Sequence, residues 1–145
     1  MWMLRSSIDV DGPVRSRLAV FLRHPDTRVR YLAVAALGRM LGPGETFVGS
    51  LIASALFDPS EDVVTQALVA VREAPALDDA SAPVVVLRLT ELFETGRRKV
   101  RLAAGITARD LLRRDPNLPL GSLVSAAASE RSWQVRQALA VDPAD

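Results

Sequence analysis

The sequence predicts an all-α protein whose helices form a solenoid of about four stacked helix hairpins. Aromatic residues make up only 5% of the chain, whereas alanine, leucine and valine are abundant, and this composition favours closely packed helices over a β-sandwich. A valine-anchored motif recurs at spacings of 34, 37 and 35 residues. Such a period is typical of a solenoid, because one hairpin cannot bury its own apolar face whereas stacked hairpins share a continuous core.

Glycine and proline divide the chain into segments of helical length, and within them apolar residues recur at i, i+3, i+4 and i+7. Pro13 and Pro83 suit the first position of a helix, and Ser60 and Ser132 suit the cap before one. The predicted helices lie near residues 13–23, 26–40, 45–57, 60–73, 82–94, 97–114, 118–129 and 132–141.

Three consecutive valines at 84–86 are the best candidate for a strand. No nearby segment can pair with them, and Leu87, Leu89, Leu92 and Phe93 continue a helical stripe beyond them. We therefore expect residues 84–86 to lie in a helix.

The repeated motif lies in the second helix of each hairpin. Its valine is expected to face the core, together with the residues on the same side of the helix, since each residue advances the helix by about 100°. The predicted core residues are Val29, Ala33, Leu37, Val63, Ala67, Val100, Ala104, Val135 and Leu139.

Residues 25–30, Pro-Asp-Thr-Arg-Val-Arg, followed by Ala33, Ala36 and residues 37–38, resemble the second helix of a HEAT repeat. The stretch from residue 115 to residue 143 is similar to the leucine-rich repeat variant, a shorter helical solenoid unit. These resemblances cover nearly all of the chain after Gly12 and imply a right-handed α-α superhelix. They say little about activity, because this class of fold serves many unrelated functions.

The HEAT resemblance also implies a role for the arginine that follows the anchoring valine. In that family this arginine usually pairs with an acidic residue in the turn of the neighbouring repeat. The resemblance gives this role to Arg30, Arg101 and Arg136. Val64 stands at the matching position of the second repeat, so the series of pairs is expected to be interrupted there.

The residue types exclude several kinds of chemistry. The chain has no cysteine, which excludes disulfides, thiolate metal sites and cysteine nucleophiles. Its single histidine, His24, is expected at the surface near a helix end, so we predict no metal site, no cofactor and no enzyme activity. No apolar run has the length of a signal peptide core or a membrane span, so we expect a cytoplasmic protein that does not contact a membrane.

One cluster of positive charge stands out from a net charge of only +1. The predicted helix 97–114 has seven basic residues and a single acidic one, Asp110; the basic residues are Arg97, Arg98, Lys99, Arg101, Arg109, Arg113 and Arg114. The helix dipole disfavours cations at the amino-terminal end, which makes Arg97, Arg98 and Lys99 candidate anion-binding residues. A solvated helix face is the simpler explanation, and a nucleic-acid-binding module using this helix is the alternative function.

A partner-binding surface is predicted on the side of the second helices that faces away from the core. The HEAT resemblance identifies this side as the concave one. Apolar residues flanked by arginines suit an extended or helical segment of another protein with hydrophobic anchors and acidic flanks, although a loop or a second copy of the chain is an equal alternative. The predicted partner-binding residues are Tyr31, Val69, Arg72, Leu102, Ile106, Arg109 and Arg113.

The last residues, 142–145, echo the turn at 58–61. This pattern indicates either an incomplete final repeat or a longer protein that was cut there. An uncapped end would leave an apolar face, so a homodimer formed through that end is a further expectation.

Overall fold

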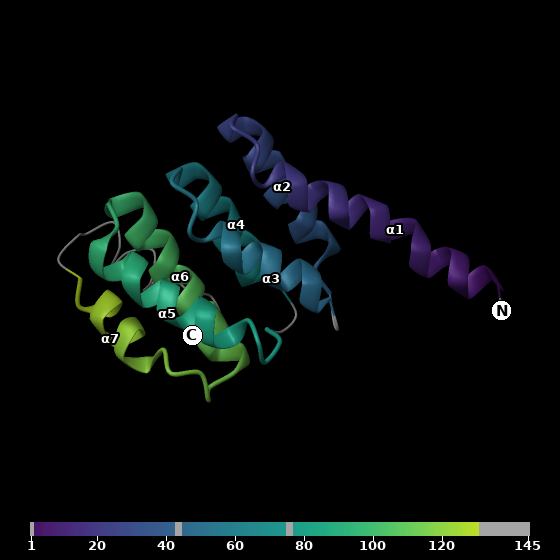
Figure 1. Ribbon diagram of the computed structural model, residues 1–145. Helices are drawn as coiled ribbons and strands as arrows, with labels where there is room; N and C mark the ends of the chain where they lie inside the picture. Colours follow the sequence, from purple (N-terminus) through teal and green to yellow (C-terminus); the bar gives the residue numbers. More distant parts are fainter. Residues whose placement is uncertain (1, 43–44, 75–76, 131–145) are drawn as a thin grey trace.

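A computed structural model describes residues 2–42, 45–74 and 77–130 of the chain (Figure 1). Within these ranges the regular structure is entirely α-helical, with no strand, which confirms the predicted all-α class. The helices in these ranges are α1 (Trp2–Phe21), α2 (Thr27–Met40), α3 (Thr46–Ala55), α4 (Glu61–Glu73), α5 (Ala82–Thr95), α6 (Arg98–Arg114) and α7 (Gly121–Ala128).

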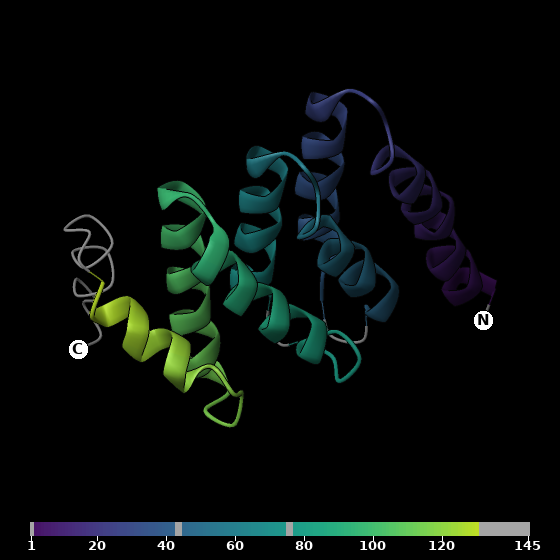
Figure 2. The same ribbon diagram turned by 60° about the vertical axis from the view of Figure 1, so that its left-hand side comes forward.

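Three helix hairpins follow one another along a row (Figure 2). They are α1–α2, α3–α4 and α5–α6, and α7 packs against α6 at the far end. The second helices pack on one another, α2 on α4 and α4 on α6, whereas α1, α3, α5 and α7 make at most slight contacts among themselves. The described core is therefore continuous along the second helices.

Most of the predicted core is confirmed. Residues at the anchoring position and on the same helix face are buried in α2, α4 and α6: Ala33, Leu37, Val63, Ala67, Val100 and Ala104. Val29 is only half-buried, so its prediction as a core residue was wrong. Val29 lies in the first turn of α2. Because α2 belongs to the hairpin at the end of the row, the second helix of another hairpin, α4, packs on one side of it only. Val135 and Leu139 lie outside the described residues.

The second helices approach closely because small residues lie between them. A β-carbon added at Gly38 of α2 would lie 3.1 Å from the β-carbon of Ala70 in α4. Ala67 of α4 and Ala104 of α6, at the equivalent positions of two successive repeats, are both completely buried. Small residues therefore lie on the packed faces of the second helices, and at Gly38 and Ala70 the backbones of α2 and α4 come close together.

The first helix is longer than predicted. We expected a helix from about residue 13 with Pro13 in its first position, but α1 begins at Trp2 and contains Pro13 inside it. A proline within a helix loses one backbone hydrogen bond and crowds the residue before it. That residue is Gly12, which has no β-carbon, and this removes part of the steric conflict.

The predicted helical state of residues 84–86 is confirmed, since all three lie in α5. Pro83 is the second residue of that helix and not its first. Ser60 occupies the cap position of α4, as predicted, although its side chain makes no capping hydrogen bond. The helix expected at 118–129 is shorter, because α7 begins at Gly121. The last predicted helix, 132–141, lies outside the described residues together with its proposed cap, Ser132.

Candidate partner-binding surface

The predicted partner-binding residues come from three neighbouring second helices. Tyr31 lies on α2, Val69 and Arg72 lie on α4, and Leu102, Ile106, Arg109 and Arg113 lie on α6. Because α2 packs on α4 and α4 on α6, these helices present one surface, which we call the second-helix surface.

The exposure of these residues differs from the expected apolar strip. The side chain of Tyr31 is exposed, with 37% of its surface accessible. Val69, Leu102 and Ile106 are half-buried, so the strip is narrow over α4 and α6. Leu32, which the sequence interpretation missed, is 59% exposed on α2. The most accessible apolar part of the second-helix surface is therefore the pair Tyr31 and Leu32.

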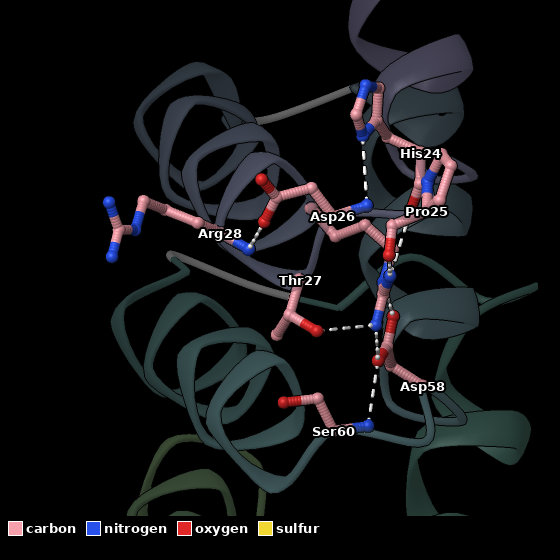
Figure 3. A network of polar contacts seen from close by, with 8 residues as sticks. His24, Pro25, Asp26, Thr27, Arg28, Asp58 and Ser60 are labelled. Carbon is pink, nitrogen blue, oxygen red and sulfur yellow. Dashed lines mark hydrogen bonds and ion pairs between the residues drawn. The ribbon is translucent and has the colours of Figure 1, made fainter.

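A hollow of about 850 Å³ lies beside this pair. Tyr31 and Leu32 form its apolar lining, and its polar lining comes from the amino-terminal ends of α2 and α4. Asp26 caps α2 through a 2.8 Å hydrogen bond that its Oδ1 accepts from the backbone N–H of Arg28. The Arg28 side chain extends away from these contacts (Figure 3) and makes no ion pair among the described residues.

Two ion pairs cross between α4 and α6 at opposite ends of the second-helix surface. At one end, Lys99 Nζ donates a 2.8 Å hydrogen bond to Asp62 Oδ1. This bond and the attraction to the same carboxylate raise the pKa of Lys99 above its ordinary value of 10.5. At the other end, Arg72 Nε lies 3.7 Å from Asp110 Oδ2.

Arg30 has a structural role between the first two hairpins, and its hydrogen-bond partners His24, Pro25, Thr27 and Asp58 are labelled in Figure 3. Its Nε and Nη2 donate to the two carboxylate oxygens of Asp58, at 2.9 and 3.2 Å, and Asp58 lies in the turn before α4. Its Nη1 donates to the backbone carbonyls of His24 and Pro25, and its Nη2 also reaches the hydroxyl of Thr27. All five guanidinium N–H donors are thus used, and Arg30 joins the α1–α2 turn to the α3–α4 turn.

The expected series of arginine pairs is present where the structure describes it. Arg30 pairs with Asp58 of the next hairpin, and Arg101 pairs with Glu130, which follows α7. Arg101 also donates to the carbonyl of Phe93 and stacks on the Phe93 ring, 4.6 Å from its centroid. Val64, at the matching position of the second hairpin, is buried, so the interruption predicted there is confirmed. Arg136 lies outside the described residues.

The basic cluster of helix 97–114 does not form one basic face. Its members bind different neighbours: Lys99 binds Asp62, Arg101 binds Glu130, Arg109 binds Asp110, and Arg114 donates to the carbonyl of Ala74. Arg97 and Arg98 are exposed and form no ion pair among the described residues. The candidate anion site is therefore reduced to Arg97 and Arg98, because Lys99 already has a carboxylate partner.

The part of the chain that the structure describes contains neither a candidate metal site nor a helix that could span a membrane. In this part no group of three or more His, Asp or Glu residues is arranged to hold a metal ion. His24 is exposed, and its Nδ1 accepts a 3.0 Å hydrogen bond from the backbone N–H of Asp26. No described helix combines the length and the apolar character needed to span a membrane.

Comparisons of the chain with protein-family models, with curated proteins and with solved structures each return no match.

Proposed function

We propose that the chain is a HEAT-like α-solenoid, a right-handed superhelix of about four hairpins, that acts as a scaffold and not as an enzyme. Its second-helix surface, the concave one in this proposal, binds a segment of another protein. The observation that carries the proposal is the exposed pair Tyr31 and Leu32 beside an open hollow on α2. Exposed aromatic and aliphatic side chains next to a concavity are typical of hot spots in protein interfaces.

The charges around this hollow support a partner with acidic residues beside its hydrophobic anchor. The two carboxylates that line the hollow already have partners, since Asp26 caps α2 and Asp62 binds Lys99. Arg28 also lines the hollow and makes no ion pair among the described residues. An acidic side chain of the partner would find its counter-charge in Arg28, and the anchor would pack on Tyr31 and Leu32.

A nucleic-acid-binding module remains the second candidate, supported by the exposed residues Arg97 and Arg98. The internal pairing of Lys99, Arg101 and Arg109 counts against it, because each phosphate contact would have to replace an ion pair that already exists. The net charge of +1 also gives little attraction to a polyanion. These charges favour the protein partner.

The proposal is tested by affinity isolation of the tagged chain from its native host, followed by mass spectrometry with and without nuclease. We expect a defined protein that is retained after nuclease treatment and is lost with Leu32→Glu, because a charge at the anchor position would have to be buried in the complex. Val84→Glu is the matched control, since Val84 is an exposed valine on α5, away from the second-helix surface.

Two outcomes would count against the proposal. Recovery that disappears with nuclease would favour nucleic acid, and Arg97→Glu should then abolish it. A protein partner that is retained equally by Leu32→Glu and by the Val84→Glu control would bind elsewhere on the molecule. Circular dichroism of both variants should match that of the wild-type chain, because both positions are exposed.

A further inference from the structure

Helix α5 has two apolar stripes: one is buried in the core, and the other is partly accessible, with its Val86 also packed against the edge of the core. Val85, Leu89, Leu92 and Phe93 are spaced as one helix face and are buried. A second stripe of Pro83, Val86, Leu87 and Thr90, at i, i+3, i+4 and i+7, lines a groove on the outside of the hairpin. Leu87 is 63% exposed there. A solvated helix would have polar residues at such positions, so this second stripe needs an explanation.

The groove beside this stripe, which we call the α5 groove, has a volume of about 630 Å³. Its other wall consists of Leu111 of α6 and of Leu118 and Pro119 in the turn before α7. Helices α3 and α7 make at most slight contacts with α5 and leave the stripe accessible. The volume lies within the range of protein ligand sites, roughly 300–1,000 Å³.

The charged residues that line the α5 groove are mostly acidic. Asp79 precedes α5, Asp115 follows α6, and both line the groove. Asp79 makes no ion pair or hydrogen bond among the described residues, whereas Asp115 accepts a 3.1 Å hydrogen bond from the backbone N–H of Asn117. Arg114 is the basic residue of the lining, and its guanidinium already donates to the backbone carbonyl of Ala74. With two carboxylates against one guanidinium, the net charge of the lining is negative.

We propose that the α5 groove binds an amphipathic helix of a partner protein, with aliphatic anchors on one face and a basic residue at one end. The anchors would pack on Leu87 and Val86, and the basic residue would pair with Asp79, as in other cases where a helix lies in a hydrophobic groove. This site is separate from the second-helix surface. Its partner carries a basic residue, whereas the segment proposed for the second-helix surface carries acidic residues. The chain would then hold two different segments on two sides of one row of hairpins.

The test uses two synthetic amphipathic helices that have the same leucine anchors and differ only in lysine or glutamate at the end residues. Binding of each labelled peptide to the full chain is measured by fluorescence anisotropy. We expect the lysine peptide to bind at least about tenfold more tightly than the glutamate peptide. Leu87→Glu should weaken its binding about tenfold or more, since it removes an anchor contact. Asp79→Lys should reverse the preference between the two peptides.

Val84→Glu is the control on the same helix, because Val84 is exposed but does not line the groove, and it should leave the dissociation constant unchanged. Leu32→Glu should also leave it unchanged, which separates this test from that of the second-helix surface. The inference is overturned if neither peptide binds, if both bind equally, or if Leu87→Glu binds like the wild-type chain. A dimer in analytical ultracentrifugation that is lost in Leu87→Glu would also overturn it, by making a second copy the occupant.

Discussion

The second helices of the hairpins pack closely on one another, whereas the first helices border open grooves. Gly38 and Ala70 bring α2 against α4, and ion pairs join α4 to α6 at both ends. Between the first helices α1 and α3 lies a groove of about 440 Å³, and α5 borders the larger α5 groove. The second helices therefore hold the row of hairpins together, and the first helices provide accessible apolar surface.

The largest expected difference between the second helices and the first helices is the loss of stability when an arginine is removed from each. Arg30→Ala should lower the free energy of unfolding by about 3 kcal/mol, because the nearly buried Asp58 carboxylate loses its counter-charge, while the backbone N–H of Ser60 still donates to it. Arg88 lies on α5, the first helix of its hairpin, where it donates to the carbonyl of Leu56 and stacks on the ring of Phe57. Arg88→Ala should cost about 1 kcal/mol, since it removes one hydrogen bond, one cation–π contact and a 4.0 Å ion pair with the exposed Glu91, but leaves no buried charge.

Chemical denaturation of the two arginine variants measures this difference directly. Equal losses of stability would show that the first helices contribute as much to the joining of hairpins as the second helices do. The free energy of unfolding of Arg30→Lys should lie between those of the wild-type chain and Arg30→Ala, because lysine keeps the charge but cannot reproduce the bidentate contact with Asp58.

A smaller effect is expected where α2 and α4 touch. Gly38→Val should destabilise the fold by about 2 kcal/mol, because its side chain would force apart two helices that already lie close together. Adding Ala70→Gly to this variant should restore part of the loss by making room on the facing helix. Thermal melts of the single and double variants test this coupling, and purely additive effects would contradict a direct contact at this position.

The smallest effect concerns the ion pair between α4 and α6. Asp62→Asn should lower the pKa of Lys99 towards its ordinary value of 10.5, since the carboxylate that stabilises the ammonium is removed. Because the folded-state pKa is raised, the contribution of this pair is complete below pH 10.5 and is lost as the pH rises through the folded-state pKa. NMR titration of the Lys99 side chain measures the shift, and an unchanged pKa in Asp62→Asn would show that the pair does not form in solution.

Helix positions and the core face of the second helices were predictable from the sequence, because both depend on local periodicity. Val63, Ala67, Val100 and Ala104 recur at the spacing of a helix face, and that spacing alone determines that they share one side. The HEAT resemblance also predicted that Arg30 pairs with an acidic residue in the turn of the neighbouring repeat, which is Asp58. The continuation of α1 through Pro13 was not predictable, since a glycine–proline pair usually marks the end of a helix.

The accessible surface, in contrast, was decided by the tertiary structure. Leu87 and Leu89 belong to one apolar run of the sequence but lie on different faces of α5, and the packing of α5 on α6 buries Leu89 and leaves Leu87 exposed. Lys99 belonged to a basic cluster in the sequence, and Asp62, 37 residues away, neutralises it. By itself, the sequence of this protein determined the positions of α2 to α6 and most of the buried side of α2, α4 and α6, because those properties depend on residues within a few turns. The tertiary structure alone decided which charges are paired and which apolar side chains remain accessible, because both depend on neighbours that stacking brings from other hairpins.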